Sequence, residues 1–339
     1  MRKIIRVMYS YIRSKFIPTP CFLRLIPTDK CNLQCGYCWQ SNNDNPSIMS
    51  QEDFNAYLAK AVKLGVGIIS FLGGEPMTWP HIYYAIKACS KNNILTDMTT
   101  NGTLLSEKNL NELGDAELDM LNISMDSLAE TSNKGLKNGL YDRLEFFKSQ
   151  YKTHVRLNAV ITRTNINEVE KLIEFAYKAK YPLSLGFVVP PISDNVDYRG
   201  SYLLFRKSDF KLLEETVKMI LKKKKEQGNI IDPDAYFQGI FDFLEGNNNW
   251  DCKFSRETVS GITIAPDGKL RTCSKLMDYV DYKFLDLSPA LIKEIRKSSV
   301  AIIEKCNSLC YSNCAYDAYY YNRHKFEFLI RQLFPAILF

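Results

Sequence analysis

Long apolar runs are missing from this chain of 339 residues. A membrane-spanning helix needs about 18 or more consecutive apolar residues, and no stretch of the sequence approaches that length. The first residues are basic, but they lack the continuous apolar core and the small-residue cleavage site of a secretory signal. These absences predict a cytoplasmic protein, in which clustered cysteines bind metal or serve catalysis more often than they form disulfides.

Charge of one sign is not concentrated anywhere either. The net charge is +6, and the longest basic run, Lys222 to Lys225, fits the solvated face of a helix. We therefore expect no nucleic-acid partner. The composition, 46% hydrophobic and 24% charged, is that of a globular protein. The length suffices for one large domain, alone or with an appendage.

Short β-rich runs alternate with amphipathic helical stretches from about residue 21 to 190. The candidate strands are Phe22–Pro27, Gly67–Leu72, Ile94–Thr99, Met120–Met125, Val155–Ile161 and Leu183–Val189, with helical patterns at about 51–64, 80–92, 106–113, 139–150 and 167–179. Such alternation gives a parallel sheet with right-handed crossovers. The sequence therefore predicts an α/β fold, an open partial (β/α)6 barrel of TIM type.

The pattern changes after Pro190-Pro191. Helices are expected at about 208–227 and 234–245, followed by a β segment, Gly261–Thr272, that turns at Pro266-Asp267-Gly268. The chain thus divides into a basic amphipathic segment (1–20), the barrel (21–200), a helical connection (201–249), a cysteine-bearing extension (250–320) and an apolar tail (321–339).

Eight of the ten cysteines fall into two groups, and the first group has the spacing C-x3-C-x2-C. Cys31, Cys35 and Cys38 follow the first predicted strand, at the end where the active sites of barrels assemble. Three thiolates can hold three irons of a [4Fe–4S] cluster and leave the fourth iron open. Structural zinc is the alternative, but it needs a fourth ligand, and neither a further Cys nor a His lies nearby. Cys21 and Cys89 stand alone and are expected to be small buried side chains.

This motif resembles that of the radical S-adenosylmethionine (SAM) superfamily, in which an aromatic residue, here Tyr37, precedes the third cysteine. Each of the next four predicted strands also has, at or near its carboxyl end, residues that resemble a motif of this superfamily. The resemblance implies that SAM is contacted by Tyr37, Gly73, Gly74, Glu75, Asn101, Ser124, Asp126 and Asn158. The ammonium group of SAM needs carbonyl and carboxylate acceptors, and glycines let the backbone approach closely.

The same resemblance implies the reaction and its cofactors. A [4Fe–4S] cluster, reduced by a donor such as flavodoxin or ferredoxin, would cleave SAM to methionine and a 5′-deoxyadenosyl radical, which abstracts a hydrogen atom from a substrate. The cofactors supply this chemistry, while the protein supplies orientation and excludes water.

The second cysteine group resembles the twitch or SPASM extension of that superfamily, which carries auxiliary clusters. It consists of Cys252, Cys273, Cys306, Cys310 and Cys314. Five cysteines are too few for two auxiliary clusters, so the resemblance implies one auxiliary [4Fe–4S] cluster held by four of the five. The spare cysteine is either structural or a hydrogen-atom donor. Zinc bound by the last three cysteines and one partner is the alternative.

Both termini allow two interpretations. The N-terminal segment is basic and amphipathic, and residues 324–339 are strongly apolar. The two ends either pack against the barrel or make a weak contact with a membrane surface.

Three function classes remain at this point. The extension favours radical modification of a peptide or protein, and modification of a small molecule (a sugar, antibiotic or lipid precursor) is the alternative. A non-catalytic iron–sulfur protein that transfers electrons is the contrasting class, although an electron carrier has no need of a Gly-Gly-Glu loop.

Overall fold

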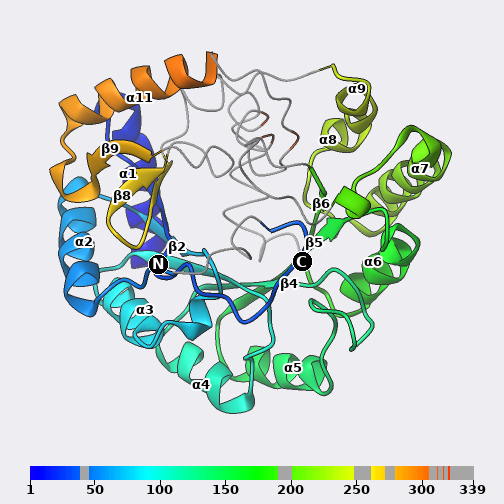
Figure 1. Cartoon of the computed structure of the whole chain (residues 1–339). Helices are drawn as coiled ribbons and strands as arrows, with labels where there is room; N and C mark the ends of the chain where they lie inside the picture. The colour runs from blue at the N-terminus through cyan, green and yellow to red at the C-terminus, as the bar shows by residue number, and fades with distance from the viewer. Residues whose placement is uncertain are drawn as a thin grey trace.

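The computed structural model describes residues 1–38, 46–189, 201–247, 261–271 and 279–304, together with Tyr311, Tyr316 and Tyr320. Within these residues, six parallel strands form the central sheet in the order β6-β5-β4-β3-β2-β1 (Figure 1). They are β1 (Phe22–Leu25), β2 (Ile68–Phe71), β3 (Leu95–Thr100), β4 (Met120–Ser124), β5 (His154–Ile161) and β6 (Leu183–Phe187). The predicted α/β partial barrel of six parallel strands is confirmed.

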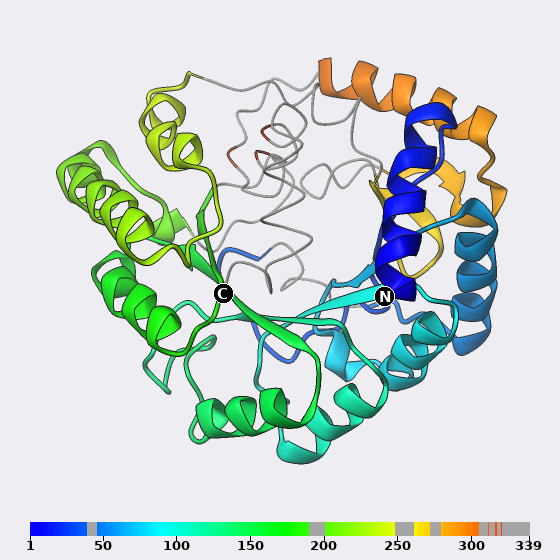
Figure 2. The ribbon, with the colours of Figure 1, turned by 180° about the vertical axis from the view of Figure 1, so that it is seen from behind.

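Helices cover the outer, convex side of the curved sheet (Figures 1 and 2). They alternate with the strands because parallel neighbours must be joined by a crossover. They are α2 (Gln51–Leu64), α3 (Ile82–Lys91), α4 (Glu107–Asp115), α5 (Leu140–Gln150), α6 (Val169–Lys178) and α7 (Phe210–Gln227). α2 begins as the sequence predicts, since the Ser50 hydroxyl accepts a hydrogen bond from the Asp53 N–H at 3.0 Å.

The sheet continues beyond β1 into the C-terminal part of the chain. β7 (Gly261–Ile264) pairs with β1 in parallel, and β8 (Lys269–Arg271) and β9 (Tyr279–Lys283) follow in antiparallel order. The predicted turn is present, and Gly268 supplies the positive φ of +80° that it requires. The parallel pairing with β1, strand β9 and helix α11 (Pro289–Glu304) are features that the sequence did not reveal.

One predicted helix is present but divided in two. The segment 234–245 forms two short helices, α8 (Asp234–Gln238) and α9 (Ile240–Leu244), which meet at Gly239. Glycine has the greatest backbone freedom and weakens a helix interior, which accounts for a break at this residue. The isolated cysteines differ from each other: Cys89 is fully buried as predicted, whereas Cys21 is only half-buried.

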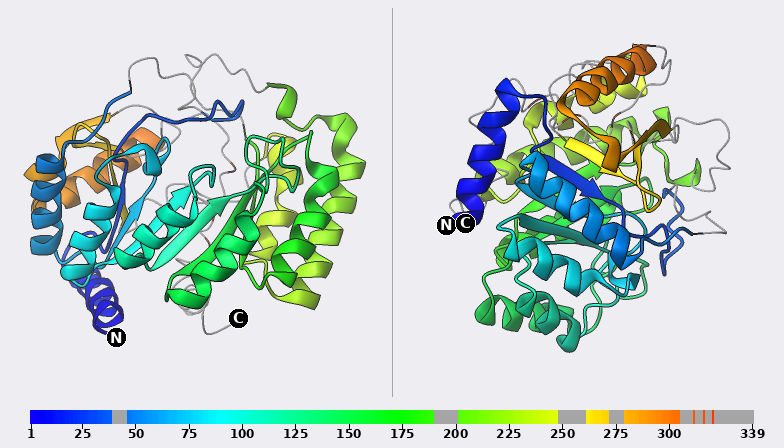
Figure 3. Two further views of the ribbon diagram at one scale, coloured as in Figure 1. Left: turned by 90° about the horizontal axis from the view of Figure 1, so that it is seen from below. Right: turned by 90° about the vertical axis from the view of Figure 1, so that its left-hand side faces the viewer.

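Helix α1 (Arg2–Phe16) lies against the edge at which the strands begin (Figure 3). Lys3 Nζ lies 2.7 Å from Asp119 Oδ2, just before β4, and Arg6 Nε donates to the Val66 carbonyl at 2.7 Å, just before β2. Arg13 donates to the Leu64 carbonyl. Among the described residues, none of the helices combines the length and apolar character needed to cross a bilayer.

The packing between α2 and the sheet predicts a large stability effect at Phe54, which is 1% exposed. Its ring lies 5.7 Å from that of Trp79 and 6.4 Å from that of Phe71. Phe54→Ala should lower the free energy of unfolding by about 3–5 kcal/mol, because it removes apolar burial and leaves a cavity. Urea unfolding measures the change. Phe146→Ala, at a 50% exposed position on α5, should stay within about 0.5 kcal/mol of the wild type.

Candidate active site

The cysteine loop follows β1 and brings its three thiols together. Cys35 is buried, Cys31 and Cys38 are half-buried, and none of the three forms a disulfide. Burial raises the pKa of Cys35 to about 11, and the charges of Cys31 and Cys38 add to this increase. Since metal binding requires thiolates, loading the loop with iron releases protons. Among the described residues, no three Cys, His, Asp or Glu side chains converge on the position of a single ion. A cluster does not require that, because each thiolate binds its own iron.

The loop after β2 clamps the start of the cysteine loop. The Gly74 N–H donates to the Thr28 carbonyl at 3.0 Å, and the Glu75 N–H donates to the Lys30 carbonyl at 2.8 Å. A Cβ on Gly74 would lie 2.1 Å from the Lys30 carbonyl oxygen, and one on Gly73, whose φ is +132°, would lie 2.6 Å from a methyl carbon of Ile26. Only glycine allows the two loops to approach this closely.

The Glu75 carboxylate ties this loop to the end of β3. Its Oε1 accepts hydrogen bonds from Thr100 Oγ1 at 2.7 Å and from the Met77 N–H at 3.0 Å, and its Oε2 accepts one from the Asn101 N–H at 2.7 Å. Burial raises the pKa of Glu75, while these hydrogen bonds act in the opposite direction. A carboxylate offers about four acceptor positions. The three donors therefore leave Oε2 with capacity for one more.

The segment after β3 reaches back to the cysteine loop. Asn101 Nδ2 donates to Asn32 Oδ1 at 2.8 Å and lies 3.9 Å from Cys31 Sγ. Asn32 in turn donates to Thr103 Oγ1 at 2.8 Å. The sequence singled out Asn101 but not Asn32 or Thr103, whose link spans two loops distant in the chain.

The predicted residues on β4 and β5 also meet. Ser124 and Asn158 are register partners, so their side chains share one face of the sheet. The Tyr37 hydroxyl donates to Asp126 Oδ2, and Asp126 Oδ1 accepts from the Val160 N–H at 2.8 Å. The structure thus gathers the cysteine loop, the glycine loop and the ends of β3, β4 and β5 at the carboxyl edge of the sheet.

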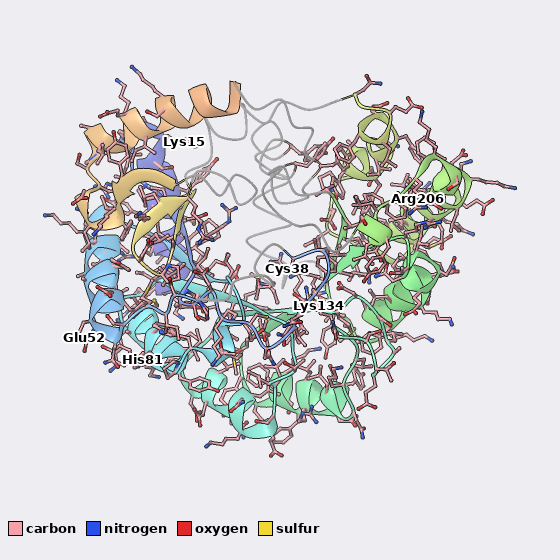
Figure 4. All side chains as sticks on the ribbon, viewed as in Figure 1. Lys15, Cys38, Glu52, His81, Lys134 and Arg206 are labelled. Carbon is pink, nitrogen blue, oxygen red and sulfur yellow. The ribbon has the colours of Figure 1, made fainter. Side chains whose placement is uncertain are left out.

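Lys134 is a member of this site that the sequence gave no reason to select. Its Nζ lies 4.9 Å from the centre of the Tyr37 ring, and its carbonyl accepts from the Asp126 N–H at 2.9 Å. Figure 4 labels Lys134 together with Cys38 of the cysteine loop. Burial alone lowers the pKa of Lys134, but its interactions with Tyr37, Asp126 and Cys35 outweigh that effect and raise it. Lys134 therefore remains a cation beside the thiols.

A polar floor of three residues lies on the inner face of the sheet, continuous with Ser124 and Asn158. Asn122 Nδ2 donates to Asp97 Oδ1 at 3.0 Å, and Arg156 Nε donates to Asn122 Oδ1 at 2.7 Å. The intervening residues of these strands point the other way, into the core beneath the helices. Burial raises the pKa of Asp97, while the charge of Arg156 opposes the increase.

The fold and the site place the protein in a class of partial barrels. Proteins of this class carry a three-cysteine loop and a glycine loop at the carboxyl ends of parallel strands. Residues 25–195 match the family model of the Radical SAM superfamily. The chain belongs to that superfamily, and it is therefore an enzyme whose cofactors are a [4Fe–4S] cluster and SAM.

Relatives and solved structures are similar over most of the chain. The GTP 3',8-cyclase of Clostridium botulinum is 30% identical over 299 residues, covering 82% of this chain and 88% of the relative. The GTP 3',8-cyclase of Thermodesulfovibrio yellowstonii is 27% identical over 301 residues, covering 83% and 90%. Streptococcus suis SuiB bound to S-adenosylmethionine has a TM-score of 0.62 at 18% identity, covering 85% of this chain and 69% of that one. The structure of anSMEcpe with bound AdoMet also has a TM-score of 0.62 at 18% identity, covering 92% and 99%.

The second cysteine group lies outside the residues that the structure describes. This applies to all five of its members, Cys252, Cys273, Cys306, Cys310 and Cys314. The strands β7 and β8 between the first two cysteines are described, and they place this part of the chain beside β1.

Proposed function

We propose that the protein cleaves SAM reductively to a 5′-deoxyadenosyl radical, which abstracts a hydrogen atom from a substrate. The observation that carries this proposal is the clamp between the glycine loop and the cysteine loop at Gly74 and Lys30. It joins three thiols to a loop with backbone and carboxylate acceptors within a few residues. The bound cluster and SAM supply the radical chemistry, and the residues of this chain hold, orient and shield them.

Each predicted residue has a role in this proposal. Cys31, Cys35 and Cys38 hold the cluster. The remaining acceptor position of Glu75 Oε2, with the backbone around Gly73 and Gly74, binds the ammonium group of SAM. The other polar residues at the carboxyl edge position the rest of the SAM molecule: Tyr37, Asn101, Ser124, Asp126 and Asn158.

The polar floor supports a substrate with polar or charged groups. The charged side chains of the floor, Asp97 and Arg156, interact more favourably with polar or charged groups of a bound molecule than with apolar ones. A peptide or protein segment with polar side chains meets this requirement and is the class that the sequence favours. A small polar molecule is the second candidate, supported by the curated relatives, which are named as cyclases of GTP.

Four of the five C-terminal cysteines hold one auxiliary [4Fe–4S] cluster in this proposal. The pairing of β7 with β1 supports it, because it attaches the extension to the strand that leads into the cysteine loop. We further propose that the protein works in the reducing cytoplasm, with a flavodoxin or ferredoxin as electron donor.

An air-free assay for 5′-deoxyadenosine tests the proposal. The reconstituted full chain, given SAM and dithionite, should form 5′-deoxyadenosine and methionine in equal amounts. Addition of GTP or of a polar peptide library should distinguish the two substrate classes, because a substrate of the correct class accelerates the cleavage of SAM. A chain with loaded clusters that forms no 5′-deoxyadenosine would sink the proposal in favour of plain electron transfer.

Lys134 should tune the cluster electrostatically. A nearby cation favours the more negative, reduced state, so Lys134→Met should lower the reduction potential by on the order of 50 mV. A redox titration followed by electron paramagnetic resonance measures the shift. Lys137→Met is the control, because Lys137 belongs to the same loop but binds the carbonyls of Glu130 and Ser132 instead. An equal shift in both variants would show that the change in potential comes from disruption of the loop and not from loss of the Lys134 charge.

A further inference from the structure

Helix α1 is amphipathic in the opposite sense from an ordinary surface helix. Val7 and Ser10 are buried against the protein, and beside them Lys3 binds Asp119 and Arg6 donates to the Val66 carbonyl. A surface helix normally buries its apolar stripe against the core. Here the contacts with the body are largely polar, so the apolar stripe is not what attaches the helix to the barrel.

The apolar stripe of α1 faces outward instead. Its side chains recur at helical spacing on one face and are largely exposed: Ile5 57%, Met8 49%, Tyr9 61%, Ile12 54% and Phe16 83%. Single exposed apolar residues are common on proteins, but a contiguous stripe on one helix marks an interaction surface.

The charges on α1 favour an anionic occupant for this stripe. The helix contains no Asp or Glu, and two exposed cations, Arg2 and Lys15, lie at its two ends. Two copies of α1 packed antiparallel would bring Arg2 of one helix near Lys15 of the other, and parallel packing would pair each cation with itself. Self-association through this stripe therefore carries a repulsive term, whereas an anionic surface gains attraction at both ends.

We propose that α1 docks the protein on an anionic lipid surface, with the stripe from Ile5 to Phe16 inserted among the headgroups and Arg2 and Lys15 against lipid phosphates. Interfacial helices of this kind combine an apolar face with flanking cations and lie in the plane of the membrane.

The position of α1 suits such docking. It lies at the edge where the strands begin, whereas the cysteine loop and its partners lie at the opposite edge, and the right-hand view of Figure 3 places the two on opposite sides. A membrane held by α1 would leave the carboxyl edge of the sheet accessible.

Vesicle flotation with the full chain tests this inference. The wild type should float with vesicles of phosphatidylglycerol and phosphatidylcholine at low salt and bind pure phosphatidylcholine weakly. Met8→Asp with Ile12→Asp should abolish flotation, and Arg2→Gln with Lys15→Gln should weaken it by about fivefold for each cation removed. Phe146→Asp is the matched control, since Phe146 is 50% exposed on α5 and should leave flotation unchanged.

Three results would overturn the proposal. The first is a wild-type chain that stays with the unbound fraction at low salt. The second is a Met8/Ile12 variant that floats as well as the wild type. The third is a wild-type dimer in solution that the same variant dissociates, which would assign the stripe to a second copy. Because the substituted side chains are exposed, 5′-deoxyadenosine formation and thermal unfolding should remain near wild-type values and report the integrity of the fold.

Discussion

A chain that carries Cys31→Ala, Cys35→Ala and Cys38→Ala should hold about four irons after air-free reconstitution, against about eight in the wild type. The loss follows because the three thiols gathered after β1 are the proposed ligands of the SAM-binding cluster, while the C-terminal cysteines remain. Formation of 5′-deoxyadenosine should fall to background. Iron and sulfide analysis, together with the air-free assay, measures both effects.

Cys21→Ala is the matched control, since Cys21 precedes the same strand, is half-buried and lies outside the cysteine loop. It should keep about eight irons and full turnover. A triple variant that still binds about eight irons would show that the loop is not a cluster ligand. A wild type that binds only about four irons, with none in the triple variant, would contradict the auxiliary cluster and support the SAM-binding cluster alone.

Gly74→Ala should reduce SAM cleavage by about 100-fold, the loss expected when a site is displaced by about 1 Å. The new Cβ would lie 2.1 Å from the Lys30 carbonyl oxygen, and the atom that must move belongs to the backbone leading into Cys31. The resulting strain should also cost about 1–3 kcal/mol of stability. Turnover and urea unfolding measure the two effects.

Gly228→Ala separates steric conflict from backbone strain. Gly228 has a φ of +76°, and nothing lies within 4 Å of the position of its Cβ. Alanine there strains the backbone but meets no neighbour, so the variant should lose some stability and keep its SAM cleavage. Equal activity in the Gly74 variant and the wild type would contradict the proposed role of the clamp.

The sequence predicted most of the barrel because short β-rich runs alternate with amphipathic helical stretches, which gives each strand a clear boundary. The six strands all appear within about two residues of their predicted bounds, the usual scatter of such boundaries. Ser50 predicts the start of α2 because a serine hydroxyl can accept a hydrogen bond from the first turn of a helix. Gly239 falls inside the helix predicted at 234–245, because a glycine in a helical pattern is often tolerated and the sequence alone does not show the break.

The site was predictable where a motif carries chemistry and unpredictable where only geometry does. Cys31, Gly74 and Asp126 come from local patterns, and the structure brings them to one edge of the sheet. Lys134 sits in a loop without any pattern, and its approach to Tyr37 depends on how two distant loops fold. Arg156 alternates with apolar residues on β5, and alternation alone does not tell which face of a strand lines the barrel.

The pairing of β7 with β1 has a consequence for the order in which the protein is made. β1 is synthesised early, but the edge that receives β7 stays without its partner until residues 261–264 have emerged. Exposed strand edges promote association with other chains, and pairings distant in sequence form slowly. A nascent or truncated chain that ends before residue 261 therefore presents an open edge next to the cysteine loop. We therefore expect a chain that lacks the extension to aggregate while it is being produced.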